Sequence, residues 1–137
     1  MNTHYQLSDA DFARQFADLS LDPKLFSHEA HLRLAWILIK REGIEKAIEM
    51  VCKQIKAFDA HHGDGTVYHE TLTTAAVHIV KHFMDKASLD DFSLMLEEFP
   101  RIKNNFKGLI EAHYSNNIFT DPFAKVTYQE PDLLPFI

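Results

Sequence analysis

The sequence has few of the residues that mark tight turns, disulfides and cysteine-based metal sites. Its 137 residues include 4 glycines, 5 prolines and a single cysteine, Cys52. So little glycine and proline argues against a β-rich fold with many turns. One cysteine excludes an internal disulfide and a cysteine-rich zinc site, and it suits a reducing compartment. We therefore expect a cytoplasmic protein.

The sequence also lacks an excess of positive charge and any long apolar run. Lys and Arg number 14 and Asp and Glu number 20, which gives a formal net charge of −6, and no basic stripe stands out. Binding to a nucleic-acid backbone is therefore not expected. The apolar runs are too short to span a membrane, and the first residues lack a basic segment followed by an apolar core. We expect neither a membrane protein nor a signal peptide.

The dominant pattern in the sequence is helical periodicity. Capping residues followed by apolar stripes predict helices over residues 8–20, 28–40, 44–60, 66–84 and 88–99. Pro100 either kinks the last of these or starts another helix. After Tyr114 three residue–proline pairs predict extended chain. The prediction is a single all-α domain, residues 1–137, built as a bundle of five or six helices with an extended, proline-containing C-terminal tail.

Histidine is the one residue type present in unusual number, with 9 copies. His28 and His31 are three residues apart, so on a helix they share a face, which also carries Ala35 and Leu38. Two imidazoles on an inward face cost free energy unless each finds a partner. The pair therefore predicts either a functional pocket or two histidines bonded to nearby carbonyls and the helix start.

A second candidate segment contains His69 and Glu70. A histidine next to a carboxylate can serve as a metal ligand and its orienting group, or as a base and an acid. The simpler interpretation is that Glu70 stabilises the positive end of a helix, while His69 is a polar residue of the first turn.

Helix order brings the two segments together. If helices 28–40 and 44–60 form an antiparallel hairpin and helix 66–84 returns beside the second, then the first and third helices run parallel. The residues that would then meet at one end of the bundle are His28, His31, His69 and Glu70. Helix amino ends disfavour protonated imidazoles and attract anions, so we expect neutral histidines and an attraction for acidic ligands.

The remaining histidines divide into one candidate and several surface residues. His113 reaches the same end of the bundle if Pro100 only kinks its helix, and the opposite end if Pro100 reverses the chain. His78 and His82 have the spacing of a zinc pair, but no glutamate follows His78 and charged residues share their side of the helix. This favours a solvated helix face.

Several of these motifs occur together in a known group of proteins. The segments His28-Glu29-Ala30-His31-Leu32, Tyr68-His69-Glu70-Thr71-Leu72-Thr73, His113-Tyr114-Ser115 and Glu130-Pro131-Asp132-Leu133-Leu134-Pro135 resemble a poorly characterised family of small bacterial all-helical proteins. The resemblance extends from about Phe26 to the C-terminus, and the Tyr-His-Glu-Thr segment is its most specific part. It implies that the motifs form one unit, and it implies no activity.

These observations predict a small-molecule site, which we first interpret as a metal-dependent enzyme. His28, His31 and His69 are the candidate metal ligands, because three protein ligands and one open position are typical of catalytic zinc. Glu70 is the candidate base on a metal-bound water, and His113 is a second candidate catalytic residue. The metal would be divalent, such as zinc, nickel, manganese or iron. A metal-free acid–base mechanism stays open, as does the question whether the protein is an enzyme at all.

Two other function classes compete with the enzyme. A non-catalytic binding module would combine Trp36, Tyr68 and Phe26 with the histidines to hold a small aromatic or acidic ligand. An interaction protein would use its apolar tail or a helix face to form a homo-oligomer, with its histidines only structurally satisfied.

Overall fold

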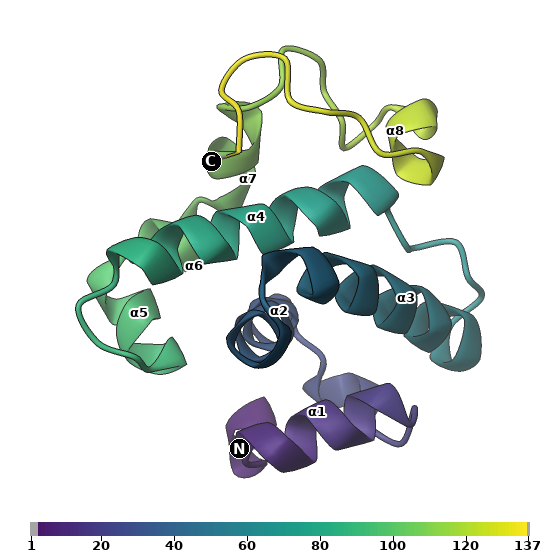
Figure 1. Cartoon of the computed structure of the whole chain (residues 1–137). Coiled ribbons are helices and arrows are strands. Elements are labelled where there is room, and N and C mark those ends of the chain that lie inside the picture. Colours follow the sequence, from purple (N-terminus) through teal and green to yellow (C-terminus); the bar gives the residue numbers. More distant parts are fainter. Residues whose placement is uncertain (1–2, 137) are drawn as a thin grey trace. The chain divides into compact units, whose positions relative to one another are not determined.

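The computed structural model describes residues 3–136, and all the regular structure in this range is helical (Figure 1). The prediction of an all-α protein is confirmed. The described residues form eight α-helices and two short 3-10 helices, more than expected, because the part of the chain after residue 87 breaks into several short helices. Across the same residues no helix has the length and apolar character needed to cross a bilayer.

The chain divides into two compact units, residues 1–68 and residues 69–137, which are described separately. The prediction of one domain over residues 1–137 stays a prediction.

The first unit is organised around its most buried helix, α2. Its elements are η1 (His4–Gln6), α1 (Asp9–Ala17), η2 (Pro23–Leu25), α2 (His28–Glu42) and α3 (Ile44–His62). Nearly every residue of α2 from Ala30 to Ile39 is buried, so this helix is covered on all sides. Both α1 and α3 pack on α2, and α1 contributes the fully buried rings of Phe12 and Phe16.

One glycine separates α2 from α3. Gly43 has a φ of 84°, a conformation that glycine adopts at little cost, and it caps both helices. In Figure 1, α2 is seen nearly end-on whereas α3 lies along the plane of view, so the two helix axes cross steeply. The expected antiparallel hairpin is therefore wrong. Antiparallel helix pairs need a loop of two to five residues, and a one-residue connection is too short to reverse the chain.

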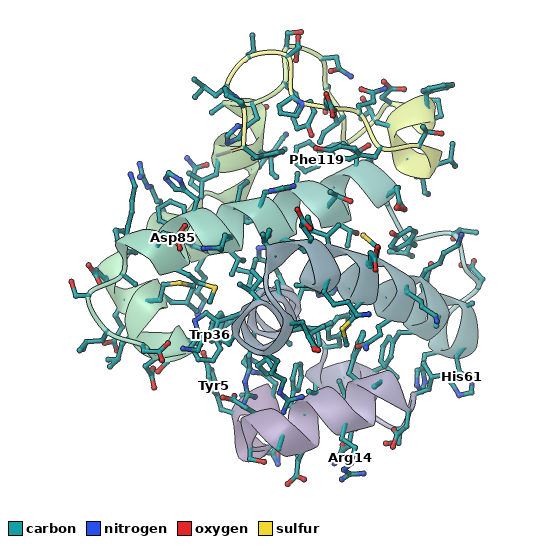
Figure 2. All side chains as sticks on the ribbon, in the orientation of Figure 1. Tyr5, Arg14, Trp36, His61, Asp85 and Phe119 are labelled. Atoms are coloured by element: carbon teal, nitrogen blue, oxygen red, sulfur yellow. The ribbon has the colours of Figure 1, made fainter. Side chains whose placement is uncertain are left out.

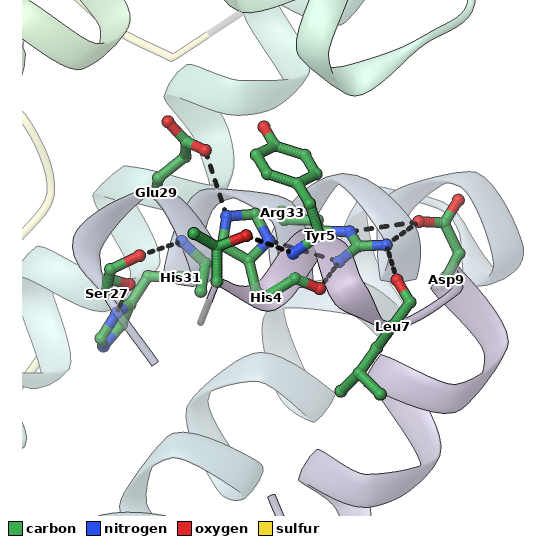
Figure 3. Close-up of polar contacts among 10 residues, drawn as sticks. His4, Tyr5, Leu7, Asp9, Ser27, Glu29, His31 and Arg33 are labelled. Atoms are coloured by element: carbon green, nitrogen blue, oxygen red, sulfur yellow. Dashed lines mark hydrogen bonds and ion pairs between the residues drawn. The ribbon is translucent and has the colours of Figure 1, made fainter. Parts of the chain in front are cut away.

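A buried arginine holds the beginning of the chain against α2. Arg33 is only 5% exposed, and its guanidinium donates to the carbonyls of His4 (2.7 Å) and Leu7 (2.8 Å) and to the carboxylate of Asp9 (2.8 Å) (Figure 3). The His4 ring also lies within hydrogen-bond distance of Arg33, and its other nitrogen lies 3.1 Å from the Glu29 carboxylate. This one side chain therefore binds two backbone carbonyls at η1 and the side chain of the first residue of α1 at the same time.

The second unit is built on α4. Its elements are α4 (Glu70–Lys86), α5 (Phe92–Glu98), α6 (Arg101–Asn104), α7 (Phe106–Glu111) and α8 (Pro122–Val126). Helices α7 and α8 both pack against α4. The prediction of extended chain after Tyr114 is wrong in part, because Pro122 stands at the first position of α8, where proline is compatible with a helix. Residues 127–136 contain no helix. Of the two alternatives for Pro100, the start of another helix is confirmed. Pro100 is the N-cap of the one-turn helix α6, which ends at Asn104 and is separated from α7 by Asn105.

We predict that replacing Arg33 with methionine lowers the free energy of unfolding of the first unit by about 3 kcal/mol, because buried carbonyls and a carboxylate lose their donor. Urea unfolding followed by Trp36 fluorescence measures this, since Trp36 lies on α2. Arg14→Met is the matched control. Arg14 pairs with Asp11 and Asp18 on the surface of α1, so its loss costs about 0.5 kcal/mol or less. Equal effects of the two variants would contradict the role given to Arg33.

Candidate functional site

The His28–His31 pair lies at the start of α2, where the helix is capped by Ser27. The Ser27 hydroxyl accepts the backbone N–H of Ala30 at 3.2 Å. His28 is exposed, whereas His31, one turn later, is partly buried and stacks on Phe26 with ring centroids 3.7 Å apart. The Nδ1–H of His31 donates to the carbonyl of Ser27 at 2.9 Å. This bond fixes the ring and leaves the lone pair of the neutral imidazole on Nε2.

The electrostatics of the pair favour neutral rings. Burial lowers the pKa of His31 to about 4, with a smaller contribution in the same direction from His28 and an opposing one from the bond to Ser27. Desolvation also lowers the pKa of His28, against the opposing charge of Glu29. The expectation of neutral histidines is met here, and burial is its first cause.

A cluster of aromatic rings supports His31 from within the first unit. Phe26, on which His31 stacks, also contacts Phe16 (4.4 Å between centroids) and Phe58 (5.1 Å). Phe16 and Phe58 stack on each other at 4.7 Å, and Phe58 contacts His62 at 4.4 Å. We call Phe16, Phe26, His31, Phe58 and His62 the aromatic cluster. It joins α1, α2 and α3, and so holds His31 on a rigid support.

The aromatic cluster also fixes the turn that follows α1. The Nε2–H of His62 donates to the carbonyl of Leu19 at 2.8 Å. Among the described residues Leu19 is the one non-glycine residue with a positive φ, 68°. Glycine is the usual residue in this left-handed position after a helix, so the leucine backbone is strained there.

His69 has a structural role that uses both of its ring nitrogens. It is the N-cap of α4, and its Nδ1 accepts the backbone N–H of Leu72 at 3.0 Å. Its Nε2–H donates to the carbonyl of Ile118 at 2.7 Å. Neither nitrogen can bind a metal while these bonds are intact, so the geometry does not support the metal-ligand prediction for His69. Glu70 is the first residue of α4, as the helix-end interpretation predicted, and its catalytic role stays a prediction.

Thr71 also joins the start of α4 to residues near α8 by hydrogen bonds. It is fully buried, and its hydroxyl lies 2.6 Å from the carbonyl of Ala124 and accepts the N–H of Gln129 at 3.0 Å. His69 and Thr71 of the Tyr-His-Glu-Thr segment therefore have structural roles in the second unit.

His113 lies beside the middle of α4 and away from its amino end. Its ring contacts Phe136 with centroids 4.4 Å apart, and Phe136 stacks on His78 at 4.7 Å. His78 follows His69 by nine residues, which is about 13 Å along a helix. The second unit therefore does not bring His113 to His69. The solvated-face prediction is also wrong for His78, which is half-buried under Phe136, and it is confirmed for His82, which is exposed.

The residues after His113 form hydrogen bonds with the C-terminal segment. The Tyr114 hydroxyl donates to the carbonyl of Gln129 at 2.8 Å, and the Ser115 N–H donates to the Asp132 carboxylate at 2.9 Å. Two of the four motifs behind the family resemblance thus contact residues 118–134, a stretch that contains most of the third motif, while the His28–Leu32 motif lies in the first unit. The sequence offered no signal for these pairings, because each joins residues far apart in the chain.

A metal centre has no geometric support in residues 3–136, where no three His, Cys, Asp or Glu side chains are grouped to hold an ion. The expected cluster combines His28 and His31 of the first unit with His69 and Glu70 of the second. That these residues meet stays a prediction. Of the aromatic residues expected in a pocket, Phe26 contacts His31. No family model, curated protein or solved structure matches the chain.

We predict that His69→Ala lowers the free energy of unfolding of the second unit by about 1–2 kcal/mol, because it removes a helix cap and a buried hydrogen bond. Asparagine at this position restores the cap alone and should recover part of the loss. Thermal unfolding followed by circular dichroism measures both variants. A His69→Ala protein as stable as the wild type would contradict the capping role.

We also predict a pH dependence of stability that comes from His31. Its folded-state pKa, about 4, lies below the ordinary value of 6.5, so the folded protein binds fewer protons than the unfolded chain. Its contribution is therefore complete above pH 6.5 and is lost as pH falls from 6.5 towards 4, by up to about 1.4 kcal/mol per pH unit. Urea unfolding of His31→Gln should show a shallower pH slope over this range than the wild type. Parallel slopes would contradict the prediction.

Proposed function

We propose that the chain is a binding protein for a small molecule, and that the ligand binds at the amino end of α2. The observation that carries this proposal is the state of His31. Its Nδ1 is committed to the Ser27 carbonyl, and its ring is fixed on Phe26. Its Nε2, with a lone pair, accepts no hydrogen bond within the described residues. A rigid, neutral acceptor of this kind suits recognition of a ligand that donates a hydrogen bond.

The surroundings of His31 suggest the chemical class of the ligand. The amino end of a helix favours negative charge, so an acidic group would be stabilised there. Phe26, which is partly exposed, lies beside the acceptor. The ligand that fits is a small acid that also carries a hydroxyl or amide donor. Binding is favoured over acid–base catalysis, because a histidine with a pKa of about 4 is too weak a base to take up protons near neutral pH.

A metal-dependent enzyme is the second candidate, and one contact favours it. Histidines that ligate metals usually donate their other ring N–H to a carbonyl or carboxylate, as His31 does to Ser27. His28 would supply a second ligand for zinc, nickel, manganese or iron. An interaction protein that forms a homo-oligomer is the remaining alternative. The single cysteine makes a reducing, cytoplasmic setting part of the proposal.

Metal content and ligand-induced thermal shifts separate these candidates. Elemental mass spectrometry is done on tag-free protein, and thermal shifts are measured with a panel of small hydroxy acids and phosphate esters. Each assay compares the wild type, His31→Ala and, as the control, His61→Ala, since His61 is an exposed histidine of the same unit. We expect no metal, together with a thermal shift that at least halves in His31→Ala and is unchanged in His61→Ala.

The other outcomes decide against this proposal. Near-stoichiometric metal that disappears in His31→Ala would replace it with the metal-dependent enzyme. The absence of both metal and any His31-dependent thermal shift would leave the interaction protein.

A further inference from the structure

The ring of His62 is fixed in the same way as the ring of His31. Its Nε2–H donates to the carbonyl of Leu19 at 2.8 Å, and the Nδ1–H of His31 donates to the carbonyl of Ser27 at 2.9 Å. Because a carbonyl only accepts hydrogen bonds, each bond fixes which nitrogen carries the proton. The neutral ring of His62 therefore has its lone pair on Nδ1. Within residues 3–136 neither this nitrogen nor Nε2 of His31 accepts a hydrogen bond.

The two imidazoles are linked through two phenyl rings of the aromatic cluster. His31 stacks on Phe26 with centroids 3.7 Å apart, and His62 contacts Phe58 at 4.4 Å. Phe26 and Phe58 contact each other at 5.1 Å. His62 is exposed and Phe26 is partly exposed, whereas Phe58 is 7% exposed. Both imidazoles and part of Phe26 are therefore accessible on the first unit.

The turn that holds His62 is the strained one. Leu19 has a φ of 68°, and its carbonyl is the acceptor that fixes the His62 ring. Strained backbone of this kind persists where the surrounding contacts hold it, and it is frequent at binding sites. A role of His62 in binding gives this strain a reason, with Leu19 as the positioning residue.

The two helix ends at these histidines carry opposite partial charges. Ser27 is the N-cap of α2, so the helix end near His31 attracts negative charge. His62 is the last residue of α3, and the carboxyl end of a helix carries a partial negative charge. An acidic group is therefore favoured at the start of α2, and a hydrogen-bond donor is favoured at the end of α3.

We infer that His62 is a second recognition residue of the same site, and that the ligand is a small aromatic acid with two hydroxyl groups. This inference rests on the proposed function. One hydroxyl donates to Nε2 of His31 and the other to Nδ1 of His62. The aromatic ring packs against the exposed part of Phe26, and the carboxylate lies at the amino end of α2.

Hydroxybenzoates test this inference, because acids with one and two hydroxyl groups differ in little else. Dissociation constants of 3-hydroxybenzoate, 3,4-dihydroxybenzoate and 3,5-dihydroxybenzoate are measured by isothermal titration calorimetry at about pH 8, where histidine side chains are ordinarily neutral. We expect at least one dihydroxy acid to bind the wild type about three- to tenfold more tightly than the monohydroxy acid, which is the gain from one more hydrogen bond.

Variants show whether His62 reads the second hydroxyl. His62→Ala should abolish the preference for two hydroxyl groups, and His31→Ala should weaken the binding of all three acids. His61→Ala is the control and should keep the preference, since His61 is exposed and contacts the His62 ring edge-on at 4.7 Å. Because two acids are compared on the same variant, a loss of stability does not imitate the expected result.

The outcomes separate this inference from the proposed function. Binding that depends on His31 but shows the same preference in His62→Ala, or equal affinities of all three acids for the wild type, overturns the inference alone. If none of the three acids binds, the inference also falls, and the wider panel of hydroxy acids and phosphate esters still decides the proposed function. A long-range proton–nitrogen spectrum gives a test without ligand, which holds even if His62→Ala fails to fold. His62 should carry its proton on Nε2, and a proton on Nδ1 overturns the inference.

Discussion

The buried guanidinium of Arg33 is the constraint on which the first unit depends. A charged group inside an apolar helix is tolerated only when acceptors surround it, and those acceptors come from His4, Leu7 and Asp9. The start of the chain must therefore lie across α2. This fixes where α1 begins and helps to close one side of the apolar packing around α2. Figure 2 shows the side chains on the ribbon, among them Trp36 of α2.

The helices could be predicted because their signals are local. Ser8 and Ser27 cap the helices that the sequence marks at these residues, whereas α5 begins only after Asp91, within the predicted range 88–99. The crossing of α2 and α3 could not be predicted, because stripes specify which face is buried and not the angle at which two faces meet. It depends on the single residue between the helices, Gly43, and its positive φ.

The candidate site was harder to predict because histidine serves several structural purposes in this chain. His69 caps a helix, His62 holds a turn, and His78 and His113 both contact the ring of Phe136. Apart from the cap on Leu72, these roles need partners from distant parts of the sequence, so they cannot be told from metal or ligand binding by spacing alone. Of the five predicted site residues, His31 has the geometry that best suits recognition, because its partner, Ser27, lies one turn away and occupies a single nitrogen.

The roles of His31 in recognition and of His69 in capping depend on opposite ring tautomers of these two histidines. A long-range proton–nitrogen correlation spectrum of the imidazoles at neutral pH measures this directly. The account predicts that His69 carries its proton on Nε2, with Nδ1 as the acceptor, and that His31 carries its proton on Nδ1, with Nε2 bearing the lone pair. A His31 ring protonated on Nε2, or a His69 ring protonated on Nδ1, would contradict the assignment of recognition to the first residue and capping to the second.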